Sequence, residues 1–139
     1  MSRADYGRRS DQFDIRLNVT SDEHVDSIVK LCDMLYLSGT ARYIHVSGVE
    51  IGDIPGRTSY GEKHVHIALI LNNYTSKASI IKKFIKDKKL GWYVEPRDKT
   101  KSLAGWIDYH GKSRTKFDPS VLFLLQRGSH PLDRDWETF

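Results

Sequence analysis

The chain has 139 residues, of which 39% are hydrophobic and 29% charged, a composition typical of one globular domain with its own core rather than of a disordered protein. Its one cysteine excludes an internal disulfide framework and a zinc site built from several cysteines, and it favours a reduced, intracellular setting. No apolar stretch resembles a signal peptide or is long enough to cross a bilayer, so we expect no membrane partner, and the formal charge of +4 is compatible with a nucleic-acid partner.

The first part of the chain predicts an arm, a strand and a helix. Residues 1–11 are polar and indicate a mobile N-terminal arm. Apolar and polar residues alternate over 13–19, which predicts a half-buried strand. A capping box at residues 20–23 begins a helix whose apolar residues recur at helical spacing, and Cys32 lies on that apolar stripe. Cys32 is therefore interpreted as a core thiol rather than a nucleophile.

Two further strands and a helix follow. A strand is predicted over 42–51, with a bulge at Gly48, and a glycine-rich loop leads from it to a third strand over 64–71. Both faces of the third strand are apolar toward its end, so we expect it to be central. A helix follows Thr75 or Ser76 and continues to about residue 91 with a lysine-rich face, which we interpret as solvated.

The rest of the chain predicts a strand over 92–95, a helix over 103–110 begun by Ser102, a strand over 121–125 and a tail over 127–139. The second and third strands can pair as an antiparallel hairpin. We therefore expect an α+β fold, a mainly antiparallel five-stranded sheet with helices packed on it.

The most informative segment is His64-Val65-His66, at the start of the third strand. Alternate side chains of a strand share a face, so the two imidazoles point the same way with Cα atoms roughly 7 Å apart and can bind one divalent ion. A carboxylate is the usual third ligand for Mg²⁺ or Mn²⁺. Glu50 lies near the histidines if the two strands are antiparallel, and Asp53 and Glu62 in the connecting loop are alternatives.

Two tyrosines are followed three residues later by a lysine. Tyr109 lies late in the third helix, where Lys112 would be its neighbour and would favour the phenolate form. The alternative is that Tyr109 packs with Trp106 on the buried face of the helix. Tyr60 lies in the glycine-rich loop, which positions a nucleophile less rigidly, and its ring could instead stack on a base.

These motifs together resemble the N-terminal endonuclease domain of replication initiator (Rep) proteins from circular single-stranded DNA viruses, members of the HUH superfamily. The histidine–hydrophobic–histidine motif is His64–His66, and the Tyr-x-x-Lys motif is Tyr109–Lys112, in the family's order. A Gly-x-Glu-x-Gly element matches Gly48–Gly52 and makes Glu50 the preferred third ligand. The segment nearest the first motif, Phe13–Asn18, keeps an aromatic start and a Leu-Asn pair but not the spacing.

The resemblance spans residues 12–126, which we expect to form one HUH endonuclease domain with an RRM or ferredoxin-like arrangement. It implies sequence-specific nicking and joining of single-stranded DNA at an origin stem-loop, to initiate rolling-circle replication. In this interpretation Tyr109 forms a 5′-phosphotyrosine, Lys112 offsets charge in the transition state, and Glu50, His64 and His66 hold Mn²⁺ or Mg²⁺. It also implies a host-nuclear location and leaves room for an oligomer of the full-length protein.

Basic, polar and aromatic residues near this site are the candidates for binding DNA. They are Arg16, Asn18, Arg57, Tyr60, Lys63, Arg97 and Arg114.

Two other functions stay open on the residues alone. A non-catalytic single-stranded nucleic-acid binding module could stack bases on Tyr43, Trp92 and Tyr93, with the histidines as ordinary polar residues. A metal-dependent phosphoesterase would use water as its nucleophile and would form no covalent link to DNA.

Overall fold

A computed structural model of the chain describes residues 7–58, 60–110 and 116–129. Its helices and strands are β1 (Arg9–Asn18), α1 (Asp22–Leu37), β2 (Ala41–Ser47), β3 (Glu50–Ile51), β4 (Lys63–Ser76), α2 (Lys77–Phe84), β5 (Trp92–Pro96), α3 (Leu103–His110) and β6 (Phe123–Arg127). None of the helices in these described ranges is long and apolar enough to cross a membrane.

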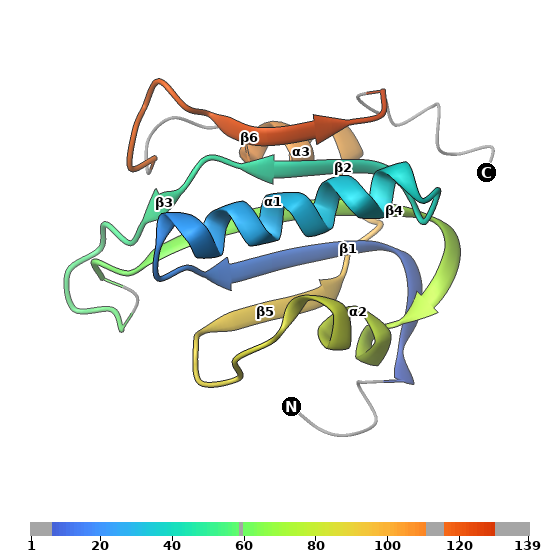
Figure 1. The fold of residues 1–139 in the computed structure, drawn as a ribbon, viewed down its shortest axis with the longest axis horizontal. Helices are drawn as coiled ribbons and strands as arrows, with labels where there is room; N and C mark the ends of the chain where they lie inside the picture. The colour runs from blue at the N-terminus through green and yellow to red at the C-terminus, as the bar shows by residue number, and fades with distance from the viewer. Residues whose placement is uncertain (1–6, 59, 111–115, 130–139) are drawn as a thin grey trace.

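The strands form one six-stranded sheet in which all the pairs are antiparallel. The order is β5-β1-β4-β2-β6, and the short β3 pairs with β4 beyond the end of β2 (Figure 1). The expected α+β class is confirmed, and β4 is central as its two apolar faces predict. The sheet has one strand more than expected because the predicted second strand is divided into β2 and β3.

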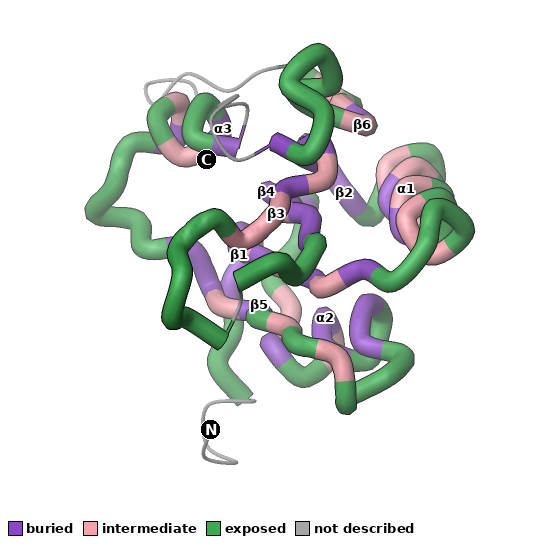
Figure 2. Tube along the Cα trace, turned by 90° about the vertical axis from the view of Figure 1, so that its left-hand side faces the viewer, coloured by how far each residue is buried: buried purple, intermediate pink, exposed green. Residues whose placement is uncertain are grey.

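Helices cover both faces of the sheet. Alternate side chains of the central strands, such as Ile15 and Ile67, pack against α1 and α2 in the main core. A smaller cluster on the other face joins Ala68 and Ile70 to Leu103 and Ile107 of α3. Figure 2 shows this layering, with α1 and α2 on one side of the buried strands and α3 on the other.

Three helix starts follow the capping chemistry that the sequence suggests, with one shift. Ser21, not Thr20, caps α1, because its side chain accepts a hydrogen bond from the backbone N–H of His24 at 3.1 Å. Ser76 caps α2 in the same way. Ser102 accepts from the N–H of Gly105 at 3.0 Å at the start of α3.

Several strand and helix ends differ from the prediction. β1 begins at Arg9, so residues 9–11, expected in the arm, belong to the sheet, where Arg9 pairs with Ser76. For the same reason β4 continues to Ser76 instead of ending at residue 71. β6 includes Arg127, the first residue of the expected tail.

The two clearest differences have identifiable causes. The strand expected over 42–51 is interrupted at Gly48, whose backbone N–H donates to the carbonyl oxygen of Leu122 at 2.9 Å. A Cβ atom at this position would lie 2.0 Å from the backbone oxygen of Val121, so the close approach requires glycine. Helix α2 ends at Phe84 rather than near residue 91. Asp87 accepts from the N–H of Lys89 at 2.9 Å, a side-chain-to-backbone turn that competes with helix.

Cys32 is completely buried in the main core, as its place on the apolar stripe of α1 predicts. Burial raises the pKa of its thiol to about 12. The thiol is therefore a packing group and not a nucleophile.

Candidate metal centre and its surroundings

The two histidines of the HVH segment lie on the α3 face of the sheet. Antiparallel pairing places Arg16 of β1 opposite His66 and Asn18 opposite His64. On the other side of β4, Glu50 of β3 is opposite His64. Because side chains at paired positions share a face, the carboxylate and both imidazoles lie together.

Glu50 is the carboxylate that completes this group. One ligand atom from each of Glu50, His64 and His66 lies within 4.8 Å of the others, and Glu50 Oε2 is 3.8 Å from His66 Nε2. Glu50 is 2% exposed and His64 is 7% exposed, whereas His66 is half-buried. Neither Asp53 nor Glu62 forms such a group with the histidines in the part of the chain that the structure describes. Two imidazoles and a carboxylate are a donor set that suits a divalent transition metal.

A lysine that belongs to none of the sequence motifs contacts this carboxylate. Lys116 Nζ donates to Glu50 Oε2 at 3.2 Å and to the carbonyl oxygen of His110 at 3.0 Å, and its side chain is fully buried. An ammonium group therefore offsets the charge of Glu50. Nothing in the spacing of the sequence signals this contact, because residues 50 and 116 meet only through the fold.

Tyr109 lies at the edge of the same site. Arg16, Glu50, His64, His66 and Tyr109 are among the residues that line an open cavity of about 230 Å³. Tyr109 is 60% exposed, so it does not pack on the buried face of α3 with Trp106, as the alternative interpretation required. The structure thus brings the three proposed ligands and the proposed nucleophile to one cavity.

The predicted DNA-binding residues other than Arg97 fall into three groups. Arg16 and Arg57 line the cavity. Asn18 of β1, Tyr60 of the β3–β4 loop and Lys63 at the start of β4 lie close by. Asn18 Nδ2 donates to Glu62 at 2.8 Å, and Lys63 Nζ lies 3.8 Å from the centre of the Phe117 ring. Arg114 lies outside the described residues, as does Lys112, which was predicted to be catalytic.

Arg97 is not brought to the cavity. Its Nε donates to Gln12 Oε1 at 2.6 Å and its Nη1 to the carbonyl oxygens of Asp98 and Lys101. Arg97 is 9% exposed, and the ring of Trp106 lies beside its guanidinium. Its hydrogen bond to Gln12 connects the residue after β5 to β1. The predicted DNA contact of Arg97 therefore stays a prediction, whereas its contacts within the fold are part of the structure.

The aromatic residues that favoured a simple base-stacking module are mostly covered. Tyr43 is fully buried and Trp92 packs against the main core, whereas Tyr93 is 46% exposed. Of the three, Tyr93 alone presents much of its ring to solvent. This arrangement weakens the stacking alternative.

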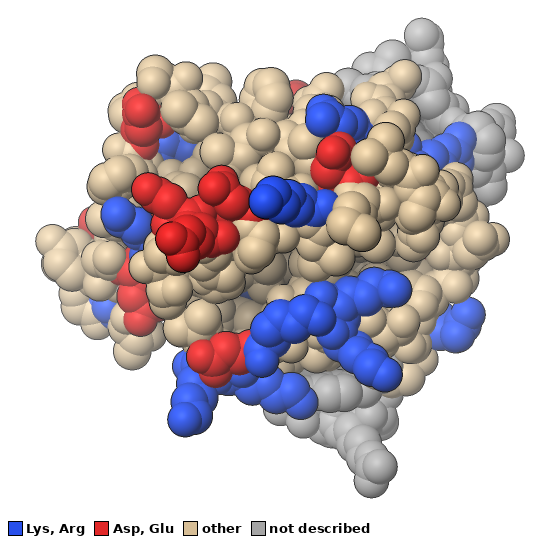
Figure 3. Space-filling view, viewed as in Figure 1, with Lys and Arg blue, Asp and Glu red and all other residues tan. Residues whose placement is uncertain are grey.

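The lysine-rich segment at α2 lies on the other face of the molecule. Figure 3 shows blue side chains gathered over α2 on the face that carries α1. Since the histidines lie on the α3 face, these lysines are not at the candidate metal centre. The exposed members are Lys82, Lys83, Lys86, Lys88 and Lys89.

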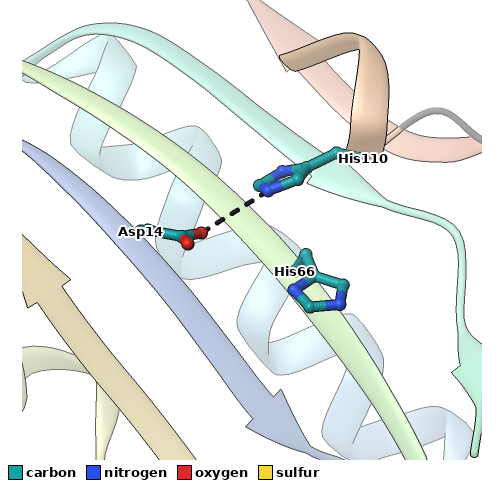
Figure 4. Close-up of side chains that lie close together, drawn as sticks. All are labelled: Asp14, His66 and His110. Atoms are coloured by element: carbon teal, nitrogen blue, oxygen red, sulfur yellow. Dashed lines mark ion pairs between the residues drawn. The ribbon is translucent and has the colours of Figure 1, made fainter. Parts of the chain in front are cut away.

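Two more residues of the site were missed from the sequence. Asp14 and His110 converge on His66, and His110 Nε2 lies 3.5 Å from Asp14 Oδ1 (Figure 4). The alternation of β1 already places Asp14 on the same face as Arg16, two residues away. His110 occupies the first of the two unspecified positions of the Tyr-x-x-Lys motif, so the motif does not single it out.

Asp14 is held in its charged form by these neighbours. Burial alone raises the pKa of the Asp14 carboxyl, but His110, Trp106 and His66 together outweigh it and hold the pKa below its usual value. A carboxylate with this environment is available to bind a cation near neutral pH.

Comparison of the chain with protein-family models finds no match, and comparison with curated proteins finds no similar sequence.

Proposed function

We propose that the protein is a metal-dependent endonuclease and strand transferase that nicks and rejoins single-stranded DNA at a viral replication origin through a 5′-phosphotyrosine. The observation that carries the proposal is the placement of Glu50, His64, His66 and Tyr109 around one open cavity. The resemblance of the HVH and Tyr-x-x-Lys motifs to the Rep endonucleases supplies the reaction. An α+β sheet with helices is compatible with that family's fold.

The residues present fit a divalent ion. Glu50, His64 and His66 would hold Mn²⁺ or Mg²⁺, and their three ligand atoms leave coordination positions open toward the cavity. Such an ion, when bound, polarises the scissile phosphate and stabilises the negative charge that develops on it. The nitrogen ligands favour Mn²⁺ over Mg²⁺.

Tyr109 is the group that reacts. Its phenolic oxygen attacks the scissile phosphorus and loses its proton to solvent. The bond from phosphorus to the 3′ oxygen breaks, and that oxygen takes up a proton and leaves as a 3′ hydroxyl. The 5′ end stays linked to Tyr109, so the energy of the phosphodiester bond is conserved and the reverse reaction joins ends.

The other residues of the cavity would hold the DNA. Arg16 and Arg57 line the cavity, where their charges can contact phosphates. Lys112, by resemblance to the family motif, would offset negative charge in the transition state. An origin stem-loop as substrate, a host-nuclear location and an oligomer of the full-length protein rest on the same resemblance.

A covalent-capture experiment tests the proposal. The protein is incubated with Mn²⁺ and an end-labelled pool of single-stranded oligonucleotides of randomised sequence, and adducts are detected on a denaturing gel. We expect an adduct that EDTA prevents and that Tyr109→Phe abolishes. Tyr74→Phe is the matched control, because Tyr74 is similarly exposed (56%) but lies near the opposite end of β4.

Each other outcome selects another function. An adduct in Tyr109→Phe would refute Tyr109 as the nucleophile, and Tyr60→Phe then tests the second Tyr-x-x-Lys segment. Cleavage without any adduct indicates a phosphoesterase that uses water. Binding of DNA that EDTA does not change, without cleavage, indicates a non-catalytic binding module.

A further inference from the structure

Four of the six histidines of the chain lie in one row across the α3 face of the sheet. The ring centroids of His64 and His66 are 5.0 Å apart, those of His66 and His110 are 5.3 Å apart, and those of His110 and His45 are 6.0 Å apart. The row joins β4, α3 and β2. The proposed catalytic ion uses the two histidines of β4 and leaves the other half of the row without a function.

The middle of this row contains a second group of metal-binding side chains. Ligand atoms of Asp14, His66 and His110 lie within 4.8 Å of one another (Figure 4). His110 is 2% exposed, and neither its Nδ1 nor Asp14 Oδ1 has a hydrogen-bond partner within the described ranges. The 3.5 Å contact between Asp14 Oδ1 and His110 Nε2 is too long for a well-formed hydrogen bond. Buried polar atoms without partners are costly unless something binds them.

We propose that Asp14, His66 and His110 form a second binding site for a divalent transition-metal ion, which competes with the Glu50–His64–His66 site. Two imidazoles and one carboxylate suit Zn²⁺, Co²⁺ or Mn²⁺ better than Ca²⁺ or Mg²⁺, which prefer oxygen ligands. A bound ion would satisfy the buried Asp14 oxygen. This site does not depend on DNA cleavage or on Tyr109.

Competition follows from the residue that the two sites share. A neutral imidazole carries one nitrogen with a free electron pair, so His66 can bind one ion at a time. Ions in both sites would require His66 to lose its second ring proton and bridge them. The chain therefore binds one ion, at either end of a pair of overlapping sites.

The charge of Lys116 disfavours an ion at the Glu50–His64–His66 site relative to the second site. Its ammonium lies 3.2 Å from Glu50 Oε2, so an ion that binds Glu50 meets a neighbouring positive charge. The contact of Asp14 is with His110, whose neutral imidazole is itself a metal ligand. An ion in the second site would withdraw His66 from Glu50 and His64.

Co²⁺ is the probe, since its visible absorption reports ligand binding directly. His64→Ala and His110→Ala are a matched pair of variants, because each removes one buried imidazole from one site only. We expect wild type and both single variants to bind one equivalent of Co²⁺. The double variant should bind more than about 100-fold more weakly, beyond the 10–100-fold that loss of an outer-shell partner costs.

A second double variant, Asp14→Asn with His64→Ala, repeats the test with a nearly isosteric change in the second site. Circular dichroism checks that each variant is folded. Loss of Co²⁺ binding in His64→Ala alone would overturn the proposal, because Asp14 and His110 would then only orient His66. Two equivalents bound to wild type would overturn the competition.

Discussion

The Lys116→Met variant measures how much the buried ion pair between Lys116 and the proposed metal ligand Glu50 contributes to the free energy of unfolding. The pair of Lys116 Nζ and Glu50 Oε2 is 3.2 Å apart, with side chains 0% and 2% exposed. Removing one partner of such a buried pair costs about 3–5 kcal/mol, because the remaining charge stays desolvated. With a urea slope of about 2 kcal/mol per M, the unfolding midpoint should fall by about 2 M in metal-free buffer.

Urea denaturation followed by circular dichroism measures this loss, with and without Mn²⁺. Lys99→Met is the matched control: its ion pair with Asp11 is shorter, at 2.9 Å, but its side chain is 46% exposed. Exposed pairs contribute about 0–1 kcal/mol. Mn²⁺ should stabilise Lys116→Met more than wild type, because the ion no longer meets the ammonium beside Glu50.

Two results would refute this reasoning. If Lys116→Met costs no more than Lys99→Met, the buried pair does not stabilise the fold. If Mn²⁺ stabilises wild type and Lys116→Met equally, the ammonium and the ion do not compete for Glu50.

Three further predictions concern the core and the sheet. Cys32, with a thiol pKa near 12 instead of 9.0, should react with iodoacetamide about a thousandfold more slowly at pH 8 when folded than in urea; equal rates would contradict its burial. Gly48→Ala should lower the free energy of unfolding by about 1–3 kcal/mol through the clash with Val121, whereas Gly105→Ala in α3 should not lower it. Arg97→Met should destabilise by about 1.5–3 kcal/mol in urea melts, and an unchanged midpoint would argue against its structural role.

Local pattern predicted the elements of this protein well where one strong periodicity extends over many residues. The alternation of β4 placed His64 and His66 on one face, and the hairpin expected from the strand order placed Glu50 beside them. These inferences succeed because strand geometry alone determines which side chains share a face. The ends of elements were less predictable, since the break at Gly48 depends on the backbone of Val121, far along the chain.

The amino-acid sequence by itself therefore determined the α+β class, the central strand and the shared face of His64 and His66. It left Glu50, Asp53 and Glu62 as candidates for the third ligand, and the pairing of β3 with β4 groups Glu50 with the histidines. Tertiary structure alone decided that Lys116 contacts Glu50, that Arg97 is used inside the fold, and that His110 reaches Asp14 across the sheet. The physical reason is distance along the chain: these contacts depend on how β5 pairs with β1 and on how α3 and the segment before β6 pack on the sheet. No short-range periodicity records that packing, so the grouping of Asp14 and His110 around His66 became visible only in the folded molecule.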